Sequence, residues 1–126
     1  MNHPPQPPTC HVYGIRNCDT MKKAFAWLAA HAVPYNFMDY GQVGVSVERL
    51  ADWSRRVGWQ CLLNTRGTTW RRLTMEERSN IDEHKALKLM AAQPSLIRRP
   101  VIDTGSALLI GFEPLHYAAH FVTGNA

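Results

Sequence analysis

No stretch of this 126-residue sequence is apolar for long enough to span a membrane. Residues 1–9 consist mainly of proline and polar residues, so they lack the apolar core of a secretion signal. We expect these residues to form a flexible tail and residues 10–126 to form a single domain. These features predict a cytoplasmic protein that does not contact a membrane.

Cysteine is scarce, because the chain has only Cys10, Cys18 and Cys61. Their odd number and irregular spacing exclude a disulfide framework and a paired Cys-x-x-Cys zinc site. The six histidines also lack the spacing of metal ligands. We therefore expect free thiols in a reducing compartment, no metal, and no tightly bound cofactor.

Acidic residues are fewer than basic residues, which leaves a formal net charge of +4. The lysines and arginines are scattered, and no nucleic-acid-binding motif accompanies them, so direct binding of nucleic acid is not expected. The positive charge favours small anionic ligands, or it serves only to keep the protein soluble.

The first part of the domain has the pattern of a β-α-β unit. Short apolar segments predict strands over residues 10–15 and 35–40. Between them, apolar residues at helical spacing predict a helix over residues 20–31, with Asp19 or Thr20 as its N-cap. A helix between two strands so close in sequence implies a right-handed crossover and parallel strands.

The middle of the chain is predicted to be helical. Ser46 caps a helix that ends near Gly58, and its expected inward face comprises Val47, Leu50, Ala51 and Val57. Residues 62–70 predict a loop, residues 74–77 fit a capping box, and a helix is expected over residues 82–92.

The last part of the chain predicts a β-hairpin followed by a helix. Two apolar segments within residues 96–112 flank a turn at residues 103–106. Pro114 suits the first turn of a helix over residues 114–120. By periodicity alone, the chain is an α/β protein with a mixed sheet.

Cys18 lies where the first predicted helix begins. The free N–H groups and the dipole of a helix's first turn favour a negative charge there. Arg16 and Lys22 add positive charge, whereas Asp19 opposes ionisation unless its side chain is occupied as a cap. Since the thiolate is the nucleophilic form of cysteine, we predict that Cys18 is reactive rather than a buried, inert residue.

The other cysteines and three arginines are candidates either for a site or for a purely structural role. Cys10 and Cys61 are predicted to be packing residues, with a role as a second reactive thiol as the alternative. Arg99, beside Pro100, is predicted to bind an anion, and the adjacent Arg98 is expected to face solvent because neighbours on a strand point to opposite faces. For Arg66, a binding role and simple exposure are equally supported.

Three segments, in this order along the chain, closely resemble the arsenate reductase (ArsC)/Spx family, and its YffB-like branch in particular. They are residues 13–24, which include Cys18, residues 63–71 and residues 93–101; the hairpin end at residues 109–112 completes the match. The resemblance implies a thioredoxin-like α/β fold with a mixed sheet. A helical insertion is expected between the β-α-β unit and the C-terminal β-hairpin-α unit.

The resemblance also implies roles for residues. Cys18 matches the family's redox cysteine, and Pro100 matches a cis-proline beside it. Arg99 matches an arginine that helps to hold the oxyanion and the thiolate. Asn17 and Thr20, which flank Cys18, are predicted to contact the substrate with Pro100.

The sequence departs from the family in two ways. Arsenate reductases that work with glutaredoxin carry three arginines around the oxyanion, but here Asn64 and Phe112 stand where two are expected. Arg16 or Arg66 could supply that charge. Spx proteins carry a Cys-x-x-Cys switch, but its second position here is Met21. An external thiol must therefore release any adduct of Cys18, and glutathione fits that need.

The sequence and this resemblance support two candidate functions. In the first, the protein is a cysteine-dependent, glutathione-dependent thiol oxidoreductase that reduces a disulfide or arsenate through a Cys18 adduct, with glutaredoxin as a further partner. In the second, it is a non-catalytic module that binds a protein such as RNA polymerase, as Spx does.

Overall fold

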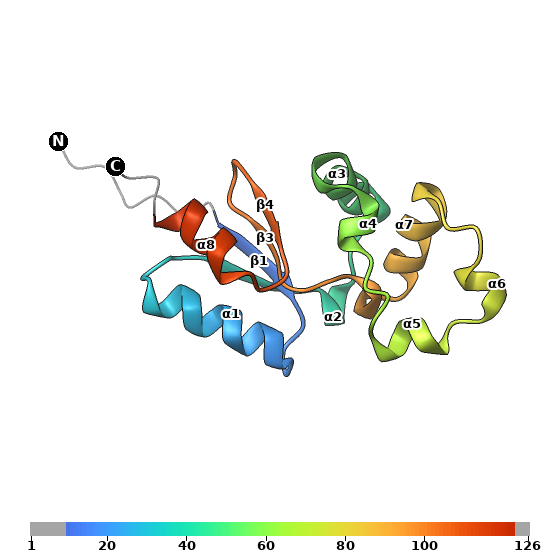
Figure 1. Cartoon of the computed structure of the whole chain (residues 1–126), viewed down its shortest axis with the longest axis horizontal. Coiled ribbons are helices and arrows are strands. Elements are labelled where there is room, and N and C mark those ends of the chain that lie inside the picture. Colours follow the sequence, from blue (N-terminus) through green and yellow to red (C-terminus); the bar gives the residue numbers. More distant parts are fainter. Residues whose placement is uncertain (1–9, 123–126) are drawn as a thin grey trace.

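The computed structural model of the protein describes residues 10–122. The predicted tail over residues 1–9 lies outside the described residues, as do residues 123–126. A sheet carries helices α1 (Asp19–Ala30) and α8 (Pro114–Phe121) on one side, and a block of helices lies on the other (Figure 1). The predicted order of a β-α-β unit, a helical insertion and a β-hairpin-α unit is confirmed. No helix within residues 10–122 has the length and hydropathy needed to cross a membrane.

The sheet has four strands in the order β2-β1-β3-β4. Strand β1 (His11–Gly14) pairs in parallel with β2 (Asn36–Asp39) and antiparallel with β3 (Val101–Asp103), and β3 pairs antiparallel with β4 (Leu108–Ile110). The crossover through α1 makes β1 and β2 parallel, whereas the short turn between β3 and β4 makes them antiparallel. The mixed sheet that the sequence predicts is therefore confirmed.

Side chains that alternate along the central strands give the sheet two apolar faces. The face toward α1 and α8 buries one cluster, which includes Val12, Met21, Leu28, Ile102 and Tyr117. The face toward the helical block buries a second cluster, which includes Tyr13, Trp53, Leu62 and Val101. The sheet therefore lies between two cores and joins them.

Helix α1 confirms the predicted helix but corrects its cap. Met21, Ala24 and Leu28 form the buried stripe that the helical spacing predicts. The N-cap is Cys18, so the prediction of Asp19 or Thr20 was wrong: the helix begins at Asp19, one residue before the predicted start and two residues before its first apolar residue, Met21. Cys18, the candidate reactive residue, therefore occupies the N-cap position of α1.

The insertion consists mainly of short helices. In chain order they are α2 (Tyr40–Val43), α3 (Val47–Val57), α4 (Trp59–Leu62), α5 (Thr68–Arg72), α6 (Met75–Arg78) and α7 (Glu83–Ala92). The Ser46 side chain accepts a hydrogen bond from the Arg49 N–H at 3.1 Å and caps α3, as predicted. The capping box between Thr74 and Glu77 is also present, so the sequence signals for helix starts are confirmed.

Three local predictions for this region were wrong. Val47 is 42% exposed, because it lies in the first turn of α3, and Trp53 fills the core instead. Residues 62–70 are not one loop, since they contain the end of α4 and the start of α5, helices too short to show periodicity. The strand expected from residue 96 begins only at Val101, after the short 3-10 helix η1 (Pro94–Leu96).

Two backbone hydrogen bonds tie the insertion to the segment that leads into β3. Asn64 N–H donates to the Leu96 carbonyl, and Arg98 N–H donates to the Leu62 carbonyl, both at 2.7 Å. They flank an isolated antiparallel bridge between Leu63 and Ile97. The end of α4 and the approach to β3, distant in sequence, are therefore held side by side.

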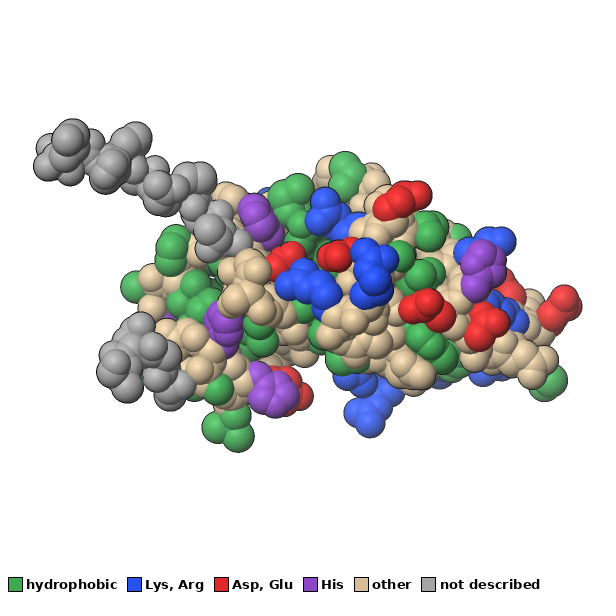
Figure 2. All heavy atoms as spheres, turned by 90° about the horizontal axis from the view of Figure 1, so that it is seen from above, with side chains coloured by type: hydrophobic (Ala, Val, Ile, Leu, Met, Phe, Trp, Pro, Cys, Tyr) green, Lys and Arg blue, Asp and Glu red, His purple; other side chains and the backbone are tan. Residues whose placement is uncertain are grey.

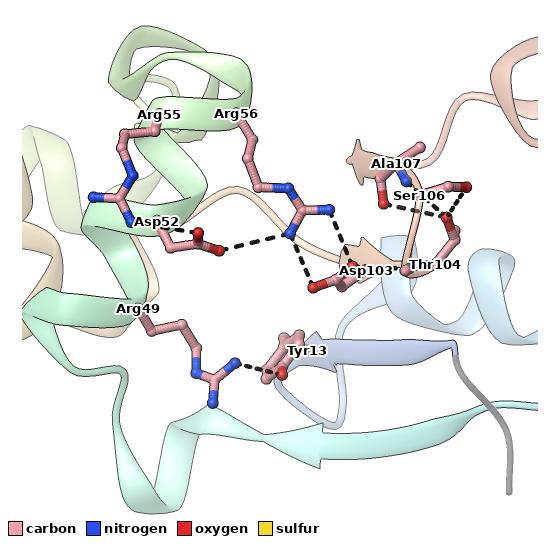
Figure 3. Close-up of polar contacts among 10 residues, drawn as sticks. Tyr13, Arg49, Asp52, Arg55, Arg56, Asp103, Thr104, Ser106 and Ala107 are labelled. Atoms are coloured by element: carbon pink, nitrogen blue, oxygen red, sulfur yellow. Dashed lines mark hydrogen bonds and ion pairs between the residues drawn. The ribbon is translucent and has the colours of Figure 1, made fainter.

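A bidentate ion pair links α3 to the hairpin (Figure 3). The guanidinium of Arg56 donates to both carboxylate oxygens of Asp103, at 3.0 and 3.1 Å, and pairs with Asp52 at 3.6 Å. Hydrogen bonding from Arg56 is the main cause that lowers the pKa of Asp103. Basic and acidic side chains also lie next to one another in the middle of the face that Figure 2 shows. That face therefore presents mixed charge rather than one basic surface.

We expect the Arg56→Gln substitution to lower the free energy of unfolding by about 0.5–1 kcal/mol at neutral pH, at the upper end for a partly exposed ion pair because the contact is bidentate. The folded-state pKa of Asp103 is depressed, so this stabilisation is present above the ordinary aspartate pKa and is lost as the pH falls through the folded-state value. Urea unfolding at neutral and acidic pH measures the difference.

The matched control is Arg55→Gln, because Arg55 is more exposed and pairs only within α3, with Asp52 at 3.4 Å. This control should change the stability by less than Arg56→Gln. Equal losses for both variants, or a loss for Arg56→Gln that persists at low pH, would contradict the role of the ion pair.

Candidate functional site

A pocket of about 300 Å³ opens where the two parts of the fold meet. Its lining comes from four places: the start of α1, the loop between α4 and α5, the segment before β3, and the end of β4. The residues are Cys18, Thr20, Asn64, Arg66, Arg98, Arg99 and Gly111. One nucleophilic side chain thus shares a small, open pocket with three arginines.

Cys18 is held at the pocket by the first turn of α1. Its carbonyl accepts the N–H of Lys22 at 3.0 Å, which begins the helix, and its side chain is partly exposed. Burial raises the pKa of the thiol, but hydrogen bonding from the Met21 N–H and from the Arg99 side chain outweighs it. The net effect is a pKa below that of an ordinary cysteine, as its place at the helix start predicts.

Arg99 is the charged partner of this thiol. Its Nη1 atom donates to the carbonyls of Ser95, at 3.1 Å, and Ile97, at 3.2 Å, which restrains the half-buried guanidinium. Burial lowers the pKa of Arg99, but hydrogen bonding to Cys18 and the neighbouring Tyr40 raise it overall. The thiolate and the guanidinium therefore stabilise each other's charged forms.

The Arg66 loop is shaped by Asn64. The Asn64 Oδ1 atom accepts the N–H of Arg66 at 3.0 Å, which closes a tight Asx turn. A Cβ atom on Gly67 would lie 2.9 Å from Asn64 Nδ2, so this position requires glycine while the Asn64 side chain stays in place. Arg71 donates to the Arg66 carbonyl at 2.9 Å and braces the loop from α5. The asparagine that stands in place of an expected arginine thus positions another arginine.

Three pocket residues, Asn64, Arg98 and Gly111, were not predicted from the sequence, and Arg98 is the charged one. It is exposed, as expected, but it lines the pocket together with Arg99, so the assignment of the two to opposite faces was wrong. The rule for strands fails here because both residues precede β3. No local signal in the sequence indicates that Arg98 lines the pocket.

The cis peptide bond between Arg99 and Pro100 is present, as the resemblance implies. Pro100 is buried, and its carbonyl accepts the N–H of Gly111 at 2.8 Å. Gly111 has φ 77°, a backbone conformation that favours glycine, and it closes the pocket on the hairpin side. Pro100 thus shapes the pocket through backbone contacts, and it is not among the described residues that line the cavity.

Arg16 and Asn17 are less closely associated with the cavity. The Arg16 guanidinium lies 4.9 Å from the centre of the Phe37 ring and pairs with Asp39 at 3.8 Å. Asn17 is exposed and has φ 63°, in the turn that leads into Cys18. Neither belongs to the pocket lining within residues 10–122. Of the predicted site residues, the structure brings together Cys18, Thr20, Arg66 and Arg99.

The remaining sulfur-containing residues differ from Cys18. Cys10 is buried, and burial, helped by Asp103, raises the pKa of its thiol to about 11. Met21, in the position of a second motif cysteine, is 1% exposed, and a Cβ on Gly14 would clash with its sulfur. Cys61 is a partly buried free thiol on α4. Among residues 10–122, no cluster of three potential metal ligands occurs.

This sheet order, with a thiol at the start of the first helix and a cis-proline before the third strand, defines a thioredoxin-like thiol protein. The ArsC family model matches residues 13–120, and the chain belongs to the ArsC family. Its fold is that of the arsenate-reductase-like thiol oxidoreductases.

Solved structures and curated proteins similar to this chain include other members of the same family. The YffB protein is 49% identical, with a TM-score of 0.86 over 89% of this chain and 98% of that one. An ArsC-related protein from Brucella melitensis is 44% identical, with a TM-score of 0.73 over 94% and 99%. An uncharacterised protein of Haemophilus influenzae is 42% identical over 87% of this chain and 96% of its own. The global transcriptional regulator Spx of Listeria innocua is 26% identical over 80% and 78%.

We expect the rate of Cys18 alkylation to reach half its maximum at a pH below the value of about 8.5 that is typical of a free thiol. Arg99→Gln should shift this midpoint upward, because it removes the guanidinium that stabilises the thiolate. Iodoacetamide labelling from pH 4 to 10, with Cys18 quantified by peptide mass spectrometry, measures the midpoint. Arg16→Gln is the control, and a shift as large as that of Arg99→Gln would contradict this assignment.

Proposed function

We propose that the protein is a thiol oxidoreductase that reduces disulfides through an adduct on Cys18 and uses glutathione as its reductant. The observation that carries the proposal is the pairing of the low-pKa Cys18 with Arg99 in an open pocket lined by two further arginines, Arg66 and Arg98. A thiolate supplies the nucleophile, and guanidinium groups bind carboxylates or oxyanions on the substrate.

The reaction runs in two exchanges. The Cys18 thiolate attacks one sulfur of a mixed disulfide between glutathione and a second thiol, the S–S bond breaks, and the second thiol leaves as a thiolate. The thiolate of another glutathione then attacks the Cys18–glutathione disulfide, which releases glutathione disulfide and regenerates the Cys18 thiolate. In total, the mixed disulfide and one glutathione become the free second thiol and one glutathione disulfide.

Use of an external thiol is favoured by the surroundings of Cys18. The residue one helical turn later is the buried Met21, which cannot form a disulfide. The thiol of Cys10 is buried, and its raised pKa disfavours the thiolate needed for attack. Cys61 lies on α4 and is not among the described pocket residues. Glutathione, abundant in a reducing cytoplasm and carrying two carboxylates, suits a pocket with three arginines.

Arsenate is the second substrate that this pocket can accommodate. Three arginines beside a cysteine provide positive charge for a small oxyanion, although Arg66 and Arg98 come from positions other than those expected from the family. In that reaction the Cys18 thiolate attacks arsenic and displaces one of its oxygens, which leaves as water. A glutathione thiolate then attacks the Cys18 sulfur, the S–As bond breaks with its electron pair passing to arsenic, and arsenite leaves. The Cys18–glutathione disulfide that remains is reduced by glutaredoxin. Assays of the same purified protein with a disulfide and with arsenate show which of the two substrates it reduces.

We expect the wild-type protein to form glutathione disulfide from glutathione and a mixed disulfide substrate, and the Cys18→Ser variant to show only the uncatalysed rate. Coupling to glutathione reductase and NADPH measures the product as it forms. Cys61→Ser should keep the wild-type rate. Turnover in Cys18→Ser equal to that of the wild type would contradict the proposal.

The arginines that line the pocket should contribute to binding of the substrate. We expect Arg66→Gln and Arg98→Gln each to raise KM about tenfold with little change in kcat, since each removes a charged hydrogen bond worth about 1.5 kcal/mol. Steady-state kinetics with varied mixed disulfide gives both constants. Arg72→Gln, which removes an exposed arginine of α5, is the control. An unchanged KM in both pocket variants would contradict an anion-binding role.

The similarity to Spx supports a second candidate, a module that binds a protein partner such as RNA polymerase without turnover. Met21 replaces the second cysteine of the Spx motif, so redox switching within that motif is not part of this candidate. Retention of purified RNA polymerase on the immobilised protein, combined with no thiol turnover, would favour it; turnover without retention would exclude it.

A further inference from the structure

Tyr40 lies directly after β2, as the first residue of α2, and is 1% exposed. Its hydroxyl donates to the Ile97 carbonyl at 3.2 Å. The same carbonyl accepts a hydrogen bond from Arg99 Nη1, also at 3.2 Å. A buried phenol and the guanidinium that faces Cys18 therefore meet at a single carbonyl oxygen.

The donors and acceptors of these groups fix the direction of each contact. A tyrosine hydroxyl has one proton, and here Ile97 receives it, so the lone pairs of the hydroxyl remain available. A guanidinium only donates, and both the Tyr40 side chain and Cys18 lie close enough to Arg99 to raise its pKa. Burial raises the pKa of Tyr40 further above its ordinary value, so the hydroxyl stays protonated at neutral pH, as this arrangement requires.

We infer that Tyr40 is a positioning residue: its hydroxyl, with the Ile97 carbonyl, fixes the Arg99 guanidinium beside the Cys18 sulfur. The inference rests on the proposed role of Cys18 as the reactive thiolate. Arginine has several rotatable bonds, and the Tyr40 hydroxyl restrains the Ile97 carbonyl to which the guanidinium donates. Without the hydroxyl, Arg99 spends less time next to Cys18, and the thiolate loses part of its stabilisation.

The test is the Tyr40→Phe substitution, which removes one oxygen from the core and keeps the ring. We expect the rate of Cys18 alkylation at neutral pH to fall by about threefold or more, as the loss of a hydrogen bond to a charged group implies. The midpoint of the rate against pH should shift upward. If Tyr40 acts through Arg99, the substitution should change nothing further in an Arg99→Gln protein.

The matched control is Tyr13→Phe. Tyr13 is another buried tyrosine whose hydroxyl meets a guanidinium, that of Arg49, at 2.7 Å (Figure 3). Loss of this hydroxyl affects stability but should leave the Cys18 profile unchanged. Thermal unfolding of both variants shows whether the fold is retained. A second measurement needs no variant. In NMR spectra of the wild-type protein, the Arg99 guanidinium protons should exchange slowly with water and show contacts to the Tyr40 ring.

The results of these experiments distinguish failure of the proposed function from failure of the role inferred for Tyr40. A wild-type midpoint in the ordinary thiol range contradicts the proposed function, and the inference falls with it. A depressed wild-type midpoint that Tyr40→Phe leaves in place overturns the inference alone. An equal shift in Tyr13→Phe, or a further shift in the Arg99→Gln background, also overturns it.

Discussion

The charge on the Cys18 sulfur is the constraint around which the rest of the structure is arranged. Burial disfavours a thiolate, so the negative charge needs compensation from nearby groups. The N–H groups of the first turn of α1 provide part of it, and the Arg99 guanidinium provides the rest. Both are needed at one point, although Cys18 and Arg99 are far apart in sequence.

The fold brings these groups together through its two cores. The core beneath α1 and α8 holds the helix start in place, with Met21 packed against Gly14. The core in the helical block holds Ile97 and Leu63, whose bridge aligns the approach to β3 with the Arg66 loop. The insertion therefore adds the Arg66 side chain to a pocket whose other two arginines, Arg98 and Arg99, come from the segment before β3.

The sequence predicts the regular parts of this arrangement well. Alternation and helical spacing identify β1, α1, β2, α7 and the hairpin, because each has an apolar pattern long enough to recognise. Cys18 and Arg99 are also found from sequence, the first by its place at a helix start and the second by the resemblance around Pro100. The capping signals at Ser46 and Thr74 hold because they depend on neighbouring residues alone.

The predictions that failed depend on contacts between distant segments. Helices α4 and α5 are too short to have a period, and packing stabilises them. The place of Arg98 in the pocket depends on an irregular backbone before Pro100, which no strand rule describes. Arg16, near Cys18 in sequence, is instead held at β2 by Asp39 and Phe37. Nor does any local pattern indicate that the Tyr40 hydroxyl shares a carbonyl with Arg99.

The account's central claim is that Cys18 alone among the three cysteines forms a thiolate that exchanges with an external disulfide. The most direct measurement is intact-protein and peptide mass spectrometry after incubation of the reduced protein with glutathione disulfide at neutral pH. We predict one glutathione per chain, bound to Cys18 and removed by added glutathione. Modification that occurs mainly at Cys61 or Cys10, or no adduct on Cys18, would contradict the account.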